Sequence, residues 1–404
     1  MALTNRFVAV LLVLGMSPAA AVAQIRQAAP QNSAPILELA SEPQGFVAEP
    51  EVIKRVAIFA DRHISGADRT AGFYADIKNL IPGSGWIGGG PGYRQWYAQD
   101  RAFFDASAGI SSNGYKTAQA RAELQRMAGG WLAVGSQIKW QDFTQIAFYG
   151  DGPDTLEANR TEYHLQSTNV VGYATLRPVR WLGVGAKIGW LTPSINRSAL
   201  ALSEEPSFIH SEASITADTR DFPEHPSAGG LLRTAISNYS DRDSGTFSFR
   251  RYEAEGAHFI PLAQSRVVLA VHGWLVASGT DEGQFVPFYL EPSLGGNNTL
   301  RGYADYRFHD RHLLLFNVET RIALMTHLDA AFLFDAGNVA ARVDDLDLGQ
   351  RSYGAGLRLH TRRRTFARFD VAHSREGWRA IFSLNEALNL SRVARRTATA
   401  PFVP

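Results

Sequence analysis

Five runs near the C-terminus alternate between apolar and polar side chains, and no other feature restricts the fold as strongly. In one of them, Leu328, Phe332 and Phe334 face away from Asp329 and Asp335. A period of two is the signature of a β-strand with one apolar face. A soluble sandwich and a membrane barrel both alternate in this way, so the period alone leaves both architectures open. The runs cover residues 314–324, 328–335, 352–360, 367–371 and 378–384.

Two earlier runs carry a tryptophan at each end. One extends from Trp131 to Trp140 and the other from Trp181 to Trp190. Aromatic side chains near both ends of a strand are typical of the girdles of a membrane barrel. We therefore expect an all-β fold, a transmembrane antiparallel β-barrel with a lipid-facing apolar wall and a polar lumen.

The length of the alternating region predicts the number of strands. Residues 72–384 span roughly 310 positions, and a membrane strand with its connection takes ~20 residues. This predicts about 16 strands, an even number as in other single-chain barrels. The expected strands begin near Gly72, Ser84, Arg101, Asn113, Gly130, Arg160, Val179, Ser207, Gly229, Thr246, Gln264, Arg311, Thr326, Gln350, Arg364 and Gly377.

The N-terminus has the pattern of a secretory signal peptide. Arg6 precedes an apolar run from Phe7 to Gly15, and Ala21 to Ala23 has the small-x-small form of a cleavage site. After residues 1–23 no apolar run approaches the ~20 residues of a membrane helix. The chain has no Cys and therefore no disulfide framework. We expect export to the bacterial outer membrane, with cleavage near Ala23.

The rest of the chain divides into three expected parts. Residues 24–71 are a periplasmic linker with one short amphipathic helix at 50–63, where Val52, Val56 and Phe59 recur at helical spacing. We expect this helix to pack on its own protein, and a membrane-surface or partner-docking role is the alternative. Residues 72–386 form the barrel. Residues 387–404 are a tail that we place in the periplasm.

A glycine-rich loop from Leu290 to Tyr303 holds a single arginine, Arg301. Glycines allow such a loop to fold back tightly on its surroundings. The guanidinium cannot lose its proton, so Arg301 needs an acceptor if it lies in a dry place. Glu319 and Asp335 lie on the lumen faces of the next two strands, where a bidentate pair with Arg301 is possible. The alternative is a solvent-exposed loop charge.

A second stretch, from Asp218 to Gly229, has the composition of a strand–turn–strand connection. Asp218, Arg220 and Asp221 can tie the backbone of the turn, and Pro226 and Gly229 suit the turn and the start of the next strand. On composition alone it is a structural turn.

Together these motifs resemble the signature of the BamA/TamA-type outer-membrane barrels, the bacterial surface antigen family. The resemblance implies that Arg301, Gly302 and Tyr303 form a loop tip inside the lumen. It implies Asp335, in a strand motif that ends at Gly337, as the main partner and Glu319 as a second partner. The matching stretches are Gly295–Tyr303, Phe316–Glu319, Phe332–Val339 and the Asp218–Gly229 turn.

The family resemblance also suggests a function. It implies a barrel that assists the insertion or translocation of proteins or lipids at the outer membrane, with membrane lipid and client molecules as partners. Family members usually carry periplasmic domains of ~75 residues, whereas only about 48 residues separate the cleavage site from Gly72. We therefore expect a member without such domains. A passive pore or structural barrel is the alternative function. In either case we expect a monomer or a loosely associated homo-oligomer.

Enzymatic and metal-dependent functions have little support in the sequence. There is no Gly-x-Ser-x-Gly elbow and no His-Glu-x-x-His pair, and the eleven histidines are scattered. Asp344, Asp345 and Asp347 lack the spacing of a calcium loop, so we expect a solvated turn. A net charge of +1 without basic clusters gives no sign of nucleic-acid binding. We expect no catalytic residues and no cofactor.

Overall fold

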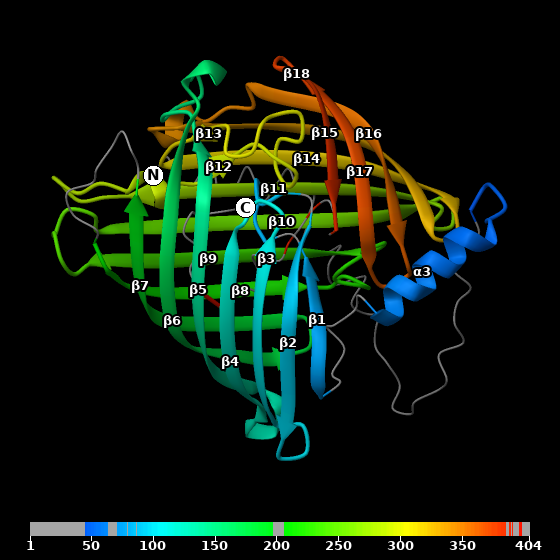
Figure 1. Cartoon of the computed structure of the whole chain (residues 1–404), viewed down its shortest axis with the longest axis horizontal. Helices are drawn as coiled ribbons and strands as arrows, with labels where there is room; N and C mark the ends of the chain where they lie inside the picture. Colours follow the sequence, from blue (N-terminus) through cyan, green and yellow to red (C-terminus); the bar gives the residue numbers. More distant parts are fainter. Residues whose placement is uncertain are drawn as a thin grey trace.

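One antiparallel sheet of sixteen strands makes up most of the molecule (Figure 1). The computed structural model describes residues 45–63, 71–78, 80–85, 87–196 and 206–384, together with 388, 390, 396 and 397. The proposed signal peptide and most of the tail lie outside these residues. The strands are β1 (Gly72–Lys78), β2 (Gly88–Tyr97), β3 (Ala102–Ser111), β4 (Lys116–Met127), β5 (Leu132–Phe148), β6 (Thr161–Val179), β7 (Leu182–Asn196), β8 (Phe208–Asp218), β9 (Gly229–Asp241), β10 (Phe249–Leu262), β11 (Val267–Gly279), β14 (His312–Met325), β15 (Leu328–Ala340), β16 (Gln350–His360), β17 (Thr365–Ser374) and β18 (Gly377–Ser383).

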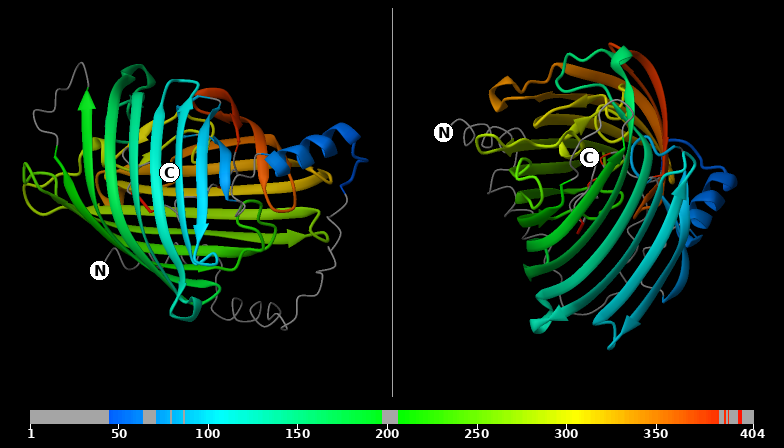
Figure 2. Two further views of the ribbon diagram at one scale, coloured as in Figure 1. Left: turned by 60° about the horizontal axis from the view of Figure 1, so that its bottom comes forward. Right: turned by 60° about the vertical axis from the view of Figure 1, so that its left-hand side comes forward.

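Each strand pairs with its neighbour in sequence, and the sheet curls around an interior (Figure 2). The two end strands of the sheet are β1 and β18. No ladder joins β1 to β18 among the residues that the structure describes. Both strands have seven residues, whereas β6 has nineteen. The two unpaired edges of the sheet, at β1 and at β18, are together called the seam below.

The side chains alternate across the wall as expected. In β15, Phe332 and Phe334 point outward and are 56% and 40% exposed, whereas Asp335 is fully buried. Trp131 and Trp181 are exposed at the ends of their strands, in agreement with an aromatic girdle. The prediction of about sixteen membrane-type strands is confirmed.

The expected strand starts lie within a few residues of the observed ones. The largest difference is at β2, which begins at Gly88 and not at Ser84. Ser84 closes a turn, because its amide donates to the Ile81 carbonyl and its hydroxyl accepts from the Ile81 amide. A residue held in this way cannot also join the ladder.

The expected amphipathic helix is present as α3 (Glu51–His63). It begins directly after Pro50, whose carbonyl accepts the amides of Ile53 and Lys54, and it packs against β17. No helix in the described part of the chain is long and apolar enough to cross a membrane.

The tail, which we expect in the periplasm, contacts the inner wall at the residues that the structure describes. Leu388 and Leu390 pack in one cluster with Leu231, Phe259 and other buried side chains of β9–β11, and Arg396 lies 4.9 Å from the ring centroid of the inward-facing Tyr173. These apolar residues are buried because the lumen beside β9–β11 offers them an apolar surface, which periplasmic water does not.

Candidate functional site

The connection between β11 and β14, residues 280–311, folds into the curve of the sheet (Figure 2). This segment is called the inner loop below. It contains a short ladder between β12 (Ser293–Leu294) and β13 (Phe308–His309). A buried hydrophobic cluster holds it against the wall. The cluster consists of Trp274, Val276, Leu313, Leu315 and Val339 from the strands and Leu294, Leu300, Tyr303 and Phe308 from the loop.

Arg301 lies at the tip of the inner loop and is 1% exposed. Its Nε and Nη2 donate to the two oxygens of Asp335, with an Nη2–Oδ1 distance of 2.6 Å. The backbone amide of Arg301 also donates to Asp335 Oδ2, at 3.0 Å. Its Nη1 donates to Glu319 Oε2 at 2.5 Å. Both predicted partners are thus in place, and the alternative of an exposed loop charge is wrong.

The ion pairs continue along the wall beyond these three residues. Arg358 in β16 binds Glu319 at 2.8 Å and Asp370 in β17 at 2.6 Å. Asp370 in turn binds Arg368 at 3.0 Å. All six side chains are at most 2% exposed. Three arginines and three carboxylates therefore alternate in one buried series. This series, Asp335–Arg301–Glu319–Arg358–Asp370–Arg368, is called the charge chain below.

Neutral groups satisfy the remaining positions around Asp335. The side-chain amide of Asn317 donates to Asp335 Oδ1 at 2.7 Å and to the Thr299 carbonyl at 2.8 Å. Ser352 donates to Asp335 Oδ2 at 3.1 Å. A buried carboxylate is stable only when such hydrogen bonds replace its water. Asp335 has donors from the inner loop, β14 and β16.

The predicted glycines Gly302 and Gly337 both allow a close approach between the loop or strand and its neighbours. At Gly302 the loop passes so close to the wall that a Cβ would lie 2.6 Å from Ser352 Cβ and 2.9 Å from Ser374 Cβ. Ser374 holds this position because it donates to the Gly302 carbonyl at 2.8 Å. At Gly337 a Cβ would lie 2.6 Å from the Leu314 carbonyl oxygen. Tyr303, the last predicted tip residue, is buried with its hydroxyl 3.4 Å from Gln350.

A second tether holds the inner loop near the longer connections of the barrel. Arg307 donates to Glu376 at 2.8 Å and to the Thr155 hydroxyl at 2.8 Å. Glu376 follows β17, and Thr155 lies between β5 and β6. The inner loop therefore joins β5–β6 to the last strands.

The Asp218–Gly229 turn is tied internally as its composition predicts. Arg220 makes a bidentate pair with Asp218, with distances of 2.9 and 2.8 Å. Asp221 Oδ1 accepts three backbone amides, those of Phe222, Ser227 and Ala228. Gly229 has φ +86°, a conformation that favours glycine.

The same turn also binds strands that are distant in the sheet, which the sequence did not indicate. The Pro226 carbonyl accepts from Arg321 in β14. The Thr365 amide in β17 donates to the Glu224 carbonyl at 3.1 Å, and Glu224 pairs with Arg364 at 2.6 Å. The turn between β8 and β9 is therefore fastened to β14 and β17.

One group of described residues could be considered as metal ligands, namely His225 in this turn with Asp329 and His360. The two imidazoles stack with centroids 4.0 Å apart and planes at 13°. Lone pairs in two parallel ring planes do not converge on one ion. Arg266, Arg321 and Arg362 line the same small cavity and add positive charge. The group suits fastening of the turn better than binding of a cation.

Sequence reasoning identified Arg301, Glu319 and Asp335 but missed Arg358, Arg368 and Asp370. The period of two placed these three residues on the lumen face. It could not show that neighbouring strands bring them within reach of Glu319, because that depends on strand register.

Asp344, Asp345 and Asp347 are not part of the site: Asp344 and Asp345 belong to the short 3₁₀ turn Val343–Asp345, and Asp347 accepts from Asn338 at 2.5 Å.

Comparison with solved structures shows that this fold is known. BamA from Haemophilus ducreyi lacking POTRA domains 1-3 matches with a TM-score of 0.61 and 13% identity, over 78% of this chain and 70% of that chain. CdiB from Escherichia coli matches with a TM-score of 0.55 and 14% identity, over 77% of this chain. CdiB from Acinetobacter baumannii matches with a TM-score of 0.51 and 13% identity, over 78% of this chain.

The chain spans 61% and 58% of the lengths of the two CdiB chains. No curated protein matches the sequence. The profile of the Omp85 superfamily domain, however, matches residues 155–374, which are more than half of the chain and include the inner loop and the charge chain. The protein therefore belongs to the Omp85 superfamily of outer-membrane barrels.

Proposed function

We propose that this barrel inserts or translocates other molecules, proteins or lipids, at the outer membrane by opening its seam. The observation that carries the proposal is the missing ladder between β1 and β18 in the described part of the sheet. Strand edges offer backbone groups to which an incoming strand can pair. A short edge facing lipid would let a client pair with the barrel and then leave sideways.

At one edge of the seam, β1 is held weakly because its partner strand β2 pairs poorly. Its partner β2 begins Gly88-Gly89-Gly90-Pro91-Gly92. Proline has no amide to donate and glycine loses much entropy in a strand, so such a segment makes a poor ladder. The β2–β3 pairing is interrupted between Gly89 and Gly92. We expect β1 and β2 to separate from the wall more readily than any other hairpin.

The β18 edge, in contrast, belongs to a firmly held part of the sheet. Strands β14 to β17 precede β18 in the sheet, and the charge chain connects all four of them to the inner loop. Buried pairs in a series resist separation, because parting any two of them leaves charges without water or partner. We therefore propose that the seam is a gate with a rigid edge at β18 and a soft edge at β1.

A passive pore is the second candidate and would use the lumen charges for selectivity. The inner loop and the β8–β9 turn both lie against the inner wall, which favours insertion over a wide pore. We further propose that the protein is not an enzyme, since the arginines and carboxylates of the charge chain bind one another. Steady ion-selective conductance in planar bilayers, without any insertion or lipid-transfer activity, would favour the pore.

The experiment joins the two edges of the seam covalently. Because the chain has no cysteine, Ala75→Cys in β1 and Ala380→Cys in β18 introduce the only two thiols, which are linked with bis-maleimides of graded length. Liposomes containing the protein then receive either an unfolded outer-membrane barrel protein or labelled phospholipid. The rates of insertion and of lipid transfer are measured before and after linking.

The control pair is Ala122→Cys with Ser136→Cys, which are directly opposite in the β4–β5 ladder. Linking these two residues restrains a wall that is already continuous. We expect the seam link to abolish one of the two activities and the control link to preserve it. Full activity with a linked seam would contradict the proposal.

A further inference from the structure

Helix α3 has an apolar face that is wider than the surface against which it packs. Ala57 is buried and Ile53 is half-buried, so this side of the helix meets the barrel. Val52 and Val56, one turn apart on the adjacent strip, are 71% and 46% exposed. Phe59 continues the strip and is 60% exposed. At 100° per residue, these three side chains lie within about 60° of each other.

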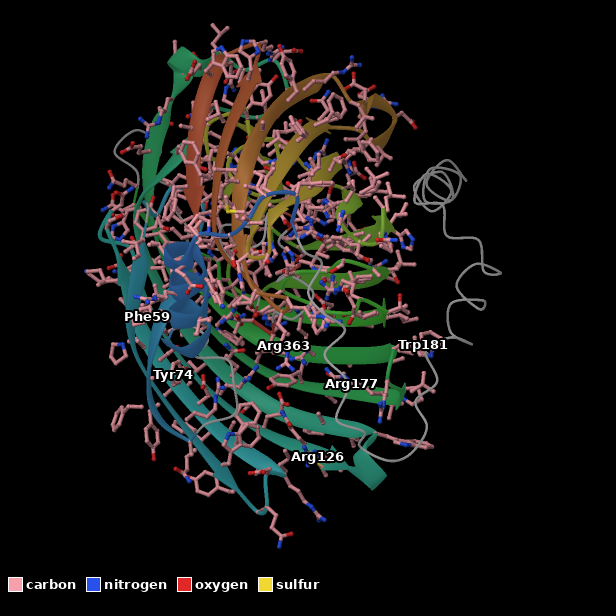
Figure 3. All side chains as sticks on the ribbon, turned by 90° about the vertical axis from the view of Figure 1, so that its right-hand side faces the viewer. Phe59, Tyr74, Arg126, Arg177, Trp181 and Arg363 are labelled. Atoms are coloured by element: carbon pink, nitrogen blue, oxygen red, sulfur yellow. The ribbon has the colours of Figure 1, made fainter. Side chains whose placement is uncertain are left out.

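The helix lies at the end of the barrel that has the short turns. Only residues 98–101, 180–181 and 326–327 separate the strands at that end in three of the hairpins, and short turns mark the periplasmic side of an outer-membrane barrel. Figure 1 shows α3 beside the ends of β16 and β17. In Figure 3, Phe59 lies on the outer side of the helix, away from the interior of the barrel.

The exposed strip continues the outer wall of the barrel. Phe369 and Val371 of β17, the strand on which α3 packs, are 47% and 36% exposed and face outward. In an outer-membrane barrel this wall is in contact with lipid. An apolar strip at the foot of the wall therefore reaches the boundary between acyl chains and headgroups.

The segment before the helix fixes this position. The Phe46 and Val47 amides donate to the Ala323 and Leu324 carbonyls of β14, at 3.2 and 2.8 Å. Glu49 accepts from the amide of His327 at 2.9 Å, in the turn after β14. Phe46 and Val47 are themselves 60% and 54% exposed. The apolar surface therefore begins before the helix and is attached to the rim by backbone hydrogen bonds.

The opposite side of α3 is charged. Lys54 lies opposite the strip with its Nζ 3.9 Å from Glu51 Oε1, and Ile58 between them is 37% exposed. Arg55 is exposed and borders the strip itself. An amphipathic helix with basic residues on its polar side suits a surface of phospholipid headgroups. A soluble partner protein would have to cover apolar residues that continue a lipid-facing wall, so lipid is the better occupant.

We propose that α3 is an interfacial helix that inserts its Val52–Val56–Phe59 strip into the periplasmic leaflet beside the seam. Its ligand is the phospholipid surface itself, with acyl chains against the apolar strip and headgroups against Arg55, which borders the strip. The helix would fix the depth of the barrel rim next to the strands that border the opening. This inference does not depend on the transport function.

The test uses the cysteine-free chain with two single-cysteine variants, Val52→Cys on the apolar strip and Lys54→Cys on the polar side. Each is labelled with an environment-sensitive fluorophore and reconstituted into phosphatidylethanolamine–phosphatidylglycerol vesicles, with folding checked by heat-modifiable gel mobility. We expect a blue-shifted label at position 52, quenched about two-fold or more strongly by nitroxide lipids than the label at position 54.

Equal and weak quenching at both positions would overturn the proposal. So would a label at position 52 that remains water-exposed in vesicles and shifts only when a periplasmic protein extract is added, because the strip would then bind a protein. As a second measurement, Val52→Ser/Val56→Ser should reduce quenching of a label at Phe59→Cys, whereas Lys54→Ser should leave it unchanged. No effect of the double variant would also count against insertion.

Discussion

Arg301 connects the inner loop to two strands through its backbone amide and the three nitrogens of its guanidinium. The contact is strong because it is bidentate, charged and dry. It is also costly to break, since Asp335 and Glu319 have no access to water. The charge chain is electrically balanced only while all six members are present.

Removing Arg301 therefore has a large expected effect. Arg301→Ala should lower the free energy of unfolding by about 3–5 kcal/mol, because it leaves buried carboxylates without their partner. Arg301→Lys should recover only part of this loss, since an ammonium cannot bind both Asp335 oxygens in a fork. Urea unfolding in detergent measures both variants. Arg363→Ala, at an exposed position, is the control. Equal stability of Arg301→Ala and this control would exclude a stabilising contact between Arg301 and the two carboxylates.

Gly302 allows a second test at the same place. Gly302→Ala should destabilise the barrel by about 1–3 kcal/mol, because the added methyl group meets Ser352 and Ser374 at less than 3 Å. Gly172→Ala has no atom within 4 Å of the new Cβ and serves as the matched control. Thermal midpoints from heat-modifiable gel mobility compare the two. A Gly302→Ala midpoint at or above that of the control would contradict the close approach.

Glu291, in the inner loop, should make stability depend on pH. Burial, followed by the carboxylates of Asp151 and Asp310, raises its pKa well above the ordinary value of 4.5. The folded state thus holds this proton more tightly than the unfolded state. The cost of ionising Glu291 is absent below pH 4.5 and grows as the pH rises towards the raised pKa.

Glu291→Gln should remove that part of the pH dependence. Thermal midpoints at pH 5 and pH 8 should differ less in this variant than in the native protein. Glu157→Gln, at an exposed position, is the control and should keep the native difference. An unchanged difference in Glu291→Gln would show that Glu291 does not titrate in this way.

At this scale the sequence predicted part of the site. Arg301, Glu319 and Asp335 could be identified because a lone arginine in a glycine-rich loop needs acceptors and because the motifs resemble a family. Arg358 lies five residues after Tyr353 and Asp370 lies seven residues before Gly377, with nothing local to mark either of them. The registers of β14 to β17 place Arg358 beside Glu319 and Asp370 beside Arg358.

Among the elements, the long strands could be predicted and the short interior pieces could not. Alternation is clear in β14–β17 because each strand has one face in lipid and one in the lumen. The ladder of β12 with β13 has two residue pairs, too few to show a period. The contacts of Leu388 and Leu390 with β9–β11 could not be predicted, because they depend on the curvature of the wall and not on local pattern.

Strand β2 offers a prediction at this scale. Pro91→Thr restores an amide donor and a β-branched side chain opposite Ala75. It should raise stability by about 0.5–1.5 kcal/mol and slow client insertion, because the soft edge becomes firmer. Pro193→Thr makes the same change in β7, away from the seam. It should leave insertion unchanged, and equal effects of both variants on insertion would argue against a soft β1–β2 edge.

For the whole molecule, the arrangement is asymmetric around the seam. The inner loop, the charge chain and the β8–β9 turn all fasten β14–β17, whereas β1 is held by a glycine- and proline-containing strand. Helix α3 packs on the rigid side of the seam. We therefore expect such a barrel to open at the β1 edge while the β18 edge keeps its shape.

Hydrogen–deuterium exchange of the native protein in lipid nanodiscs tests this asymmetry directly. We predict that amides of β1 and of the first half of β2 exchange at least about 100-fold faster than those of β14–β17, because local opening there costs several kcal/mol less. Arg301→Ala should reduce the difference by increasing exchange in β14–β17. Equal protection of β1 and β17 in the native protein would contradict a gate with one soft and one rigid edge.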